Sequence, residues 1–232
     1  MKRIVLGLSG ASGAPYAKRL IEVLRGSSLG PSPTGRELSR PIEISLVLSR
    51  TAETVWQHEC GGSPRALGLP CYDGRDYAAP FASGSSAPDA MAIVPASMSC
   101  IARIAHGISD DLLTRAADVV LKERKALVVM PREAPYSSIH LENMLALTRA
   151  GAVVVPASPS FYGRPQSLQD AIDSVLARVL DHLGLPNALS KRWGQDISLQ
   201  DNNQKAAGTA AGTTPVSTVA SAAADDEEAS HG

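Results

Sequence analysis

The sequence predicts an α/β fold in which a doubly wound, Rossmann-like parallel sheet has helices on both faces, a three-layer α/β/α arrangement. Of the 232 residues, 44% are apolar but only 4% are aromatic, so Val, Leu, Ile and Ala carry most of the apolar content. Short apolar runs alternate along the chain with segments of helical periodicity. Parallel strands buried on both faces are aliphatic runs of this kind, and each needs a crossover to reach the next strand.

The first unit of the predicted sheet begins near the N-terminus. Residues 4–8 form a short apolar run that stops at a glycine-rich turn, residues 9–13. Leu20, Val23 and Leu24 then recur at helical spacing. The order of strand, turn and helix indicates a βα unit.

The same alternation continues to residue 183. Residues 61–88 are only weakly patterned, and we expect them to hold either a small edge element or a long functional loop. Further strands are predicted at residues 42–48, 90–94, 126–130 and 152–155, and further helices at residues 50–58, 98–106, 110–122, 138–150 and 167–183.

The domain organisation follows from composition. Residues 26–40 are rich in Gly, Ser, Pro and charge without a period, which predicts an exposed loop inserted after the first helix. From residue 202 onward the chain is mainly Ala, Gly, Thr, Ser and acidic residues, which bury too little apolar surface to fold. We therefore expect one domain, residues 1–194, and a C-terminal tail, residues 195–232, disordered from about residue 202.

Composition also excludes several classes of protein. The net charge is −1, and acidic residues are interspersed among the basic ones, which argues against nucleic-acid binding. Cys60, Cys71 and Cys100 have neither the spacing nor the neighbouring histidines of a zinc site, so we expect reduced thiols and no metal. No run of about 18 apolar residues is present, so we expect a soluble, cytoplasmic protein.

Ligands of such sheets bind beyond the carboxyl ends of the strands. Small, polar and charged residues follow these ends here, so they are expected to converge on one crevice. The segments are residues 9–13, Ser49, residues 96–100, residues 131–137 and residues 156–163.

The turn at residues 10–13 offers small side chains and backbone N–H groups at a helix start, which favour an anion. It lacks the GxGxxG spacing of a dinucleotide site and the lysine of a P-loop. Ala14 also stands where a serine hydrolase elbow has glycine. A tight turn that binds no ligand remains the alternative.

Other residues in these segments offer further polar groups. Residues 97–100 could hold a polar portion of a ligand or could simply cap a helix. Arg132 and Glu133 lie between two prolines and could face a ligand or form a surface ion pair. Arg132, Tyr162, Arg178 and Lys122 could together clamp a phosphate. Alternatively, Arg178 is a solvated helix residue and Lys122 a favourable cation at a helix end.

Taken together, these segments resemble those of the UbiX family of flavin prenyltransferases. The matching segments are GLSGASG at residues 7–13, LLTRAAD at residues 112–118, LKER at residues 121–124 and, most specifically, PREAPYSSIHLENM at residues 131–144. Residues 156–166 and 192–194 extend the resemblance, which covers most of residues 3–194 and leaves out the insertion and the tail.

The resemblance implies that reduced FMN is both the bound molecule and the acceptor, and that dimethylallyl monophosphate is the donor, without a metal. The positions matching flavin contacts are Gly10, Ala11, Ser12, Ser49, Ser97, Met98, Ser99, Cys100 and Arg132. The positions matching contacts to the prenyl donor are Lys122, Arg132, Glu133, Tyr162 and Arg178. The implied catalytic residues are Ser12, Glu59, Lys122, Glu133 and Trp193.

The resemblance also implies partners and leaves alternatives. It implies bond formation at flavin N5, ring closure at C6, a UbiD-type decarboxylase that uses the product, and a homo-oligomer, by analogy a dodecamer. A flavin-dependent cysteine decarboxylase is the nearest alternative, but those enzymes carry a catalytic histidine where this chain has Tyr16, and Pro-x-Met-Asn where it has Pro131-Arg-Glu. The remaining alternatives are a non-catalytic FMN carrier and an aromatic-acid decarboxylase in its own right.

Overall fold

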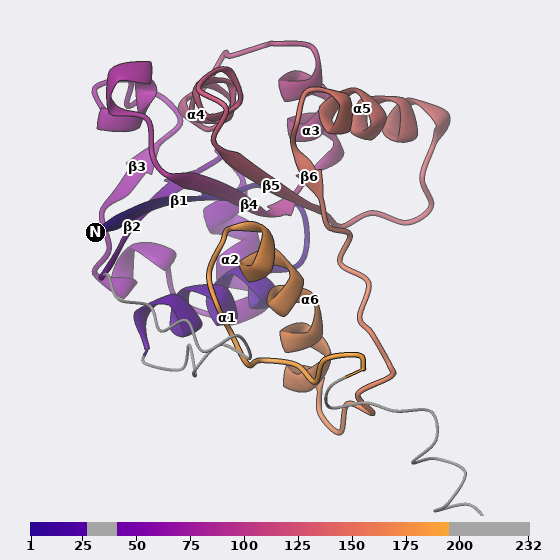
Figure 1. The fold of residues 1–232 in the computed structure, drawn as a ribbon. Helices are drawn as coiled ribbons and strands as arrows, with labels where there is room; N and C mark the ends of the chain where they lie inside the picture. The colour runs from indigo at the N-terminus through magenta and orange to yellow at the C-terminus, as the bar shows by residue number, and fades with distance from the viewer. Residues whose placement is uncertain (27–40, 195–232) are drawn as a thin grey trace, which may run out of the picture. The chain divides into compact units, whose positions relative to one another are not determined.

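The computed structural model describes residues 1–26 and 41–194, and within them it confirms the predicted parallel α/β sheet. The strands form one sheet in the order β3-β2-β1-β4-β5-β6, and every neighbouring pair is parallel (Figure 1). The strands are β1 (Lys2–Leu8), β2 (Ile42–Leu48), β3 (Cys71–Asp73), β4 (Ala90–Ala96), β5 (Ala126–Pro131) and β6 (Val153–Val154).

Helices cover both faces of the sheet, as the doubly wound fold requires (Figure 1). One apolar cluster joins the sheet to the first, second and last helices, and a second cluster joins it to the other three. The helices are α1 (Ala14–Arg25), α2 (Ala52–Cys60), α3 (Met98–Ala105), α4 (Leu112–Lys122), α5 (Ser138–Arg149) and α6 (Leu168–His182).

Successive side chains of a central strand belong alternately to the two clusters. In β1, Ile4, Leu6 and Leu8 belong to the cluster beneath α1, α2 and α6, whereas Val5 belongs to the cluster beneath α3, α4 and α5. Successive side chains of a strand point to opposite faces, so a strand covered on both sides must be apolar at every position. Every residue of β4 is buried, which explains why it appears in the sequence as an uninterrupted run.

The first residue of a helix is set by its capping residue rather than by the spacing of its apolar residues. Asp111, Ser137 and Ser167 each form a capping box, which fixes the first residues of α4, α5 and α6. The start predicted at residue 110 therefore moves to Leu112. The weakly patterned segment 61–88 contains the edge strand β3 together with three 3-10 turns, η1 (Pro64–Leu67), η2 (Pro80–Ala82) and η3 (Gly84–Ser86).

The chain divides into two units, Met1–Arg192 and Trp193–Gly232. Most of the predicted insertion, residues 27–40, and the predicted disordered tail lie outside the described residues. Within the described part of the chain, no helix has both the length and the apolar composition needed to cross a membrane.

Packing of α6 on the sheet gives a direct stability prediction. Leu176 is fully buried in α6, whereas Leu168 at the start of the same helix is 77% exposed. We expect Leu176→Ala to lower the free energy of unfolding by about 2–5 kcal/mol, because it opens a cavity in the core. Leu168→Ala is the matched control and should change it by about 0.5 kcal/mol or less. Urea denaturation checks both; equal losses would contradict the packing described.

Candidate functional site

The strand order predicts a ligand crevice at the carboxyl ends of β1 and β4. The chain runs from β1 outward to β2 and β3, then returns to the other side of β1 to form β4. The connections after β1 and β4 therefore lead to opposite faces of the sheet, which leaves an opening between them. Gly10, Ala11 and Ser12 follow β1, and residues 97–100 follow β4, so the predicted flavin-contacting segments flank this position.

Ser9 joins the two sides of this crevice. Its hydroxyl donates to the carbonyl oxygen of Pro95 at 2.7 Å and accepts the backbone N–H of Ser97 at 2.8 Å. It also accepts the N–H of Ala11, at 3.4 Å. Ser9 is 3% exposed, so these bonds are shielded from water. Its side chain was not among the predicted site residues; the only indication in the sequence is a polar residue that closes a buried strand.

The amino-terminal end of α1 is occupied by the carboxylate of Glu59. This carboxylate, from the end of α2, accepts the backbone N–H groups of Gly13 and Ala14 at 2.8 Å each. The Ser12 side chain also hydrogen-bonds to Glu59. Arg132 Nε donates to the carbonyl oxygen of Ser12 at 2.9 Å. The structure thus brings Ser12, Glu59 and Arg132 together. The Glu59 carboxylate is itself the anion that accepts the two N–H groups at this helix start.

The charge on Glu59 is stabilised by this arrangement. Burial by itself would raise the pKa of the carboxyl group. Hydrogen bonds from Ser12, Gly13 and Ala14, together with the positive charge of Arg132, outweigh burial and hold the pKa of Glu59 below its ordinary value. Glu59 is therefore an ionised acceptor at neutral pH.

The crevice residues also fit a flavin nucleotide. The Oγ atom of Ser49 is buried without a hydrogen-bond partner at the carboxyl end of β2. Ser49 lines a pocket of about 540 Å³ whose charged residues are three arginines and four acids: Arg50, Arg65, Arg75, Glu53, Asp73, Asp110 and Asp111. A Cβ atom on Gly10 would lie 1.9 Å from Thr51 Oγ1, so only glycine permits this close approach of backbone. The unpartnered Ser49 hydroxyl is the group that fits a ligand here, since the acids of the pocket outnumber its arginines.

The segment after β4 offers backbone rather than side chains. Ser97 caps α3 by accepting the N–H of Cys100 at 3.3 Å, and its hydroxyl lies 3.2 Å from that of the exposed Ser99. Met98 and Cys100 are 8% and 1% exposed and pack into the core. Burial raises the pKa of Cys100 to about 12, so its thiol stays protonated.

Two residues of the predicted phosphate clamp lie away from the crevice within one chain. Lys122 ends α4, ahead of the first residue of β5, and pairs with Glu123 at 2.5 Å. Arg178 lies about 15 Å along α6 from its first residue and pairs with Asp181 at 2.7 Å. Lys2 Nζ, at the start of β1, donates to the Leu183 carbonyl just past α6. Both cations therefore lie toward the end of the sheet where the strands begin. Arg132 lies at the opposite end, so the three residues do not meet within one chain.

The other predicted residues are exposed. Glu133 follows Arg132 and accepts the N–H of Ala134 at 3.1 Å. Tyr162, in the loop after β6, is 68% exposed. Trp193 belongs to the second unit, and its side chain is 56% exposed.

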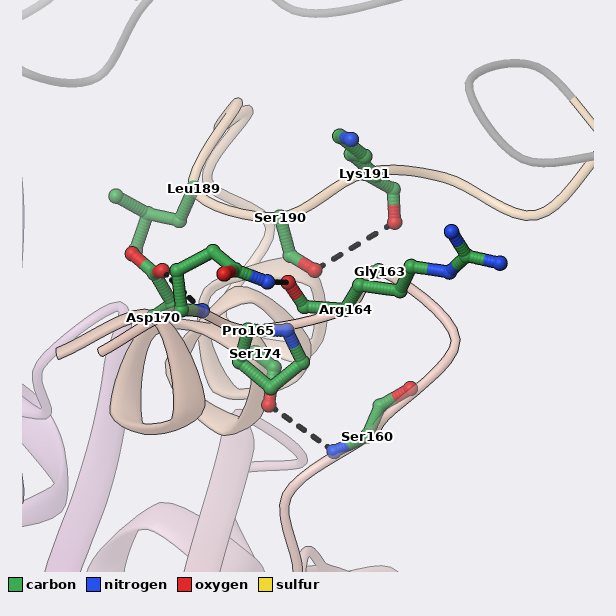
Figure 2. A pocket seen from close by; sticks show the side chains of 10 residues that line it. Ser160, Gly163, Arg164, Pro165, Asp170, Ser174, Leu189, Ser190 and Lys191 are labelled. Carbon is green, nitrogen blue, oxygen red and sulfur yellow. Dashed lines mark hydrogen bonds between the residues drawn. The ribbon is translucent and has the colours of Figure 1, made fainter. Parts of the chain in front are cut away.

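A separate pocket of about 280 Å³ lies where the loop after β6 meets α6 (Figure 2). Ser160 of the loop donates its N–H to the buried Ser174 hydroxyl at 3.1 Å, drawn as a dashed line in Figure 2. The neighbouring Asp173 forms a two-bond ion pair with Arg19 of α1 at 2.8 and 2.9 Å. These contacts tie the loop that carries Tyr162 to the helix layer.

The bonds to Glu59 predict a pH-dependent stability. The pKa of Glu59 is lowered by folding, so its contribution is complete above the unfolded value of about 4.5 and is lost as pH falls through the lower folded value. Glu59→Gln should lower the melting temperature at neutral pH, with the difference from wild type shrinking below pH 4.5. Glu142→Gln, at an exposed position on α5, is the control. A difference independent of pH would refute this role.

Comparison with known proteins identifies the family. A model described as Flavoprotein matches residues 1–180. The flavin prenyltransferase UbiX of Thermoplasma acidophilum is 46% identical over 194 residues, which cover 82% of this chain and 99% of that protein. The structure of AnUbiX in complex with FMN and dimethylallyl pyrophosphate is 40% identical, with a TM-score of 0.74, and covers 83% of this chain and 97% of its own.

A second solved structure extends the similarity to an assembled relative. The dodecameric FMN-dependent UbiX-like decarboxylase from Escherichia coli O157:H7 is 42% identical, with a TM-score of 0.73, and the match covers 82% of this chain and 98% of that one. The chain belongs to the flavoprotein family and, within it, to the UbiX-like flavin prenyltransferases.

Proposed function

We propose that this protein transfers a dimethylallyl group to reduced FMN. The observation that carries the proposal is the hydrogen bond between Arg132 and Ser12 at the crevice. It joins the most specific family segment, residues 131–144, to another matching segment, residues 7–13, beside the ends of β1 and β4. Similarity to flavin prenyltransferases over more than four fifths of the chain supports the same activity.

The crevice residues would hold FMN through backbone and charge. Gly10, Ala11 and Ser12 would supply backbone and a hydroxyl, the unpartnered Ser49 hydroxyl would gain a bond, and Arg132 would add a cation. Ser99 and the backbone of residues 97–100 would approach from the β4 side. Bound reduced FMN supplies the N5 and C6 atoms to which we propose the dimethylallyl group becomes attached.

The prenyl donor must lose its phosphate as the allylic carbon–oxygen bond breaks. Fixed cations and a hydroxyl stabilise a leaving phosphate without a metal ion. We assign this role to Lys122, Arg178 and Tyr162. The electron-rich ring of Trp193 would stabilise the allylic cation. Glu133, or the released phosphate, would carry protons in the ring-closure step: one to the alkene of the attached group, so that its other alkene carbon can bond to C6, and one away from C6 afterwards.

The separation of Lys122 and Arg178 from Arg132 supports a site completed by other copies of the chain. Each lies in a helix, toward the end of the sheet where the strands begin, so a neighbouring copy is the simplest source of either cation at the crevice. A dodecameric relative supports a homo-oligomer for this chain. The prenylated flavin would serve as cofactor for a UbiD-type decarboxylase.

The alternatives predict different chemistry. A cysteine decarboxylase would oxidise a thiol substrate, but this chain has Tyr16 in place of the catalytic histidine of that group. A carrier would bind FMN unchanged and would have no use for Lys122, Tyr162 and Arg178. An aromatic-acid decarboxylase would release carbon dioxide without a partner enzyme.

Mass measurement of the flavin tests the proposal. After anaerobic incubation with reduced FMN and dimethylallyl monophosphate, we expect the flavin to gain one five-carbon unit. A parallel incubation with dimethylallyl pyrophosphate distinguishes the two donors. If FMN binds and its mass is unchanged with both donors, the prenyl transfer proposed here is refuted and the carrier alternative is favoured.

Variants separate transfer from flavin binding. Tyr162→Phe and Arg178→Ala should each lower turnover by about 100-fold or more, because each removes a group from the departing phosphate. FMN affinity should stay within about twofold, because both residues are assigned to the departing phosphate rather than to the flavin. Arg149→Ala, which removes an exposed arginine at the end of α5, is the matched control. Unchanged turnover in Arg178→Ala would contradict the assigned role.

Subunit mixing tests the shared site. Lys122→Ala and Arg132→Ala should each be inactive when they form the whole assembly. Co-refolded mixtures should recover part of the wild-type turnover, because some sites then combine an intact Lys122 with an intact Arg132. Mixtures that stay as inactive as the separate variants would place both residues in the site of one chain.

A further inference from the structure

We propose that Ser9 is a positioning residue for the flavin site, an inference that rests on the proposed function. Its hydroxyl has one donor and two acceptor positions, and all three are used. It donates to Pro95 and accepts from Ser97 and Ala11. A single buried oxygen therefore sets the spacing between the turn that follows β1 and the helix start that follows β4.

Strand pairing alone does not hold these two segments together. The β1–β4 register runs from Ile4 paired with Ala90 to Gly7 paired with Ile93 and stops there. Beyond it, the Ser9 N–H reaches the Pro95 carbonyl at 3.3 Å, and the Ser9 hydroxyl makes the shorter bonds to Pro95 and Ser97. The hydroxyl thus extends the β1–β4 connection past the last paired residues, where FMN would be bound.

The position of Ser9 excludes direct contact with substrate. Ser9 is 3% exposed, and all three hydrogen-bonding positions of its hydroxyl are used within the chain. Loss of the hydroxyl would leave the Ser97 N–H without its acceptor and would remove one of the bonds to the turn at residues 10–13. Glu59 and Arg132 would keep their bonds to the other side of that turn. The predicted effect is therefore a crevice whose two walls are less well spaced around the flavin.

The test compares Ser9→Ala with Ser9→Thr, which keeps the hydroxyl, in the full-length protein. Ser9→Ala should raise the dissociation constant for FMN about tenfold and alter the visible absorption spectrum of bound FMN. The KM for FMN should rise in step, while the KM for dimethylallyl monophosphate stays within about twofold. Ser9→Thr should restore the affinity to within about threefold of wild type.

Ser174→Ala is the matched control, because it removes another buried serine hydroxyl that accepts a loop N–H and donates to a carbonyl. It should leave the FMN dissociation constant unchanged. If Ser9→Ala does not fold, Ser9→Cys carries the comparison, since a thiol fills the space of the hydroxyl and forms weaker hydrogen bonds.

A lower melting temperature in Ser9→Ala with an unchanged FMN dissociation constant and spectrum would overturn the proposal, because it would show a purely structural role. A loss of affinity that Ser9→Thr does not restore would also overturn it. The proposed function fails separately: wild-type protein that binds FMN without prenylating it refutes the transfer, while the affinity comparison still decides the role of Ser9. Wild-type protein that does not bind FMN refutes both.

Discussion

The Ser9 hydroxyl sits where the strand order reverses, and the geometry of the candidate site depends on it. A parallel sheet that winds in two directions must separate the segments that leave its two central strands, and the separation opens a crevice. Here the separation is bridged by one oxygen that contacts Pro95, Ser97 and Ala11. The walls of the crevice are therefore held by this buried hydroxyl together with the backbone bond from the Ser9 N–H to the Pro95 carbonyl.

A second set of contacts secures the outer side of the same turn. Glu59 arrives from α2 to accept the first N–H groups of α1, and Arg132 arrives from the end of β5 to bond Ser12. Three segments distant in sequence thus converge on residues 9–14. The acid satisfies donors that would otherwise be orphans at the helix start, and its charge is balanced by the arginine.

The sequence was sufficient for the layers of the fold and for much of the crevice. Every predicted strand is present because strands covered on both faces are mainly apolar, and the turn at residues 10–13 is a local glycine pattern. Local patterns do not reveal tertiary partners, so neither the Ser9 bridge nor the capping of α1 by Glu59 could be deduced from spacing. The same limit applies to the clamp: Lys122 and Arg178 lie late in α4 and α6, which run back to the edge where strands begin.

The central claim is that FMN lies at the point where the strand order of the sheet reverses. A crystal structure of the protein with FMN tests this most directly. We predict the flavin between the carboxyl ends of β1 and β4, with polar contacts to residues 10–12, residues 97–99 and Arg132. Flavin bound only in the pocket formed by Ser160, Ser174 and Lys191, or elsewhere on the surface, would contradict the account.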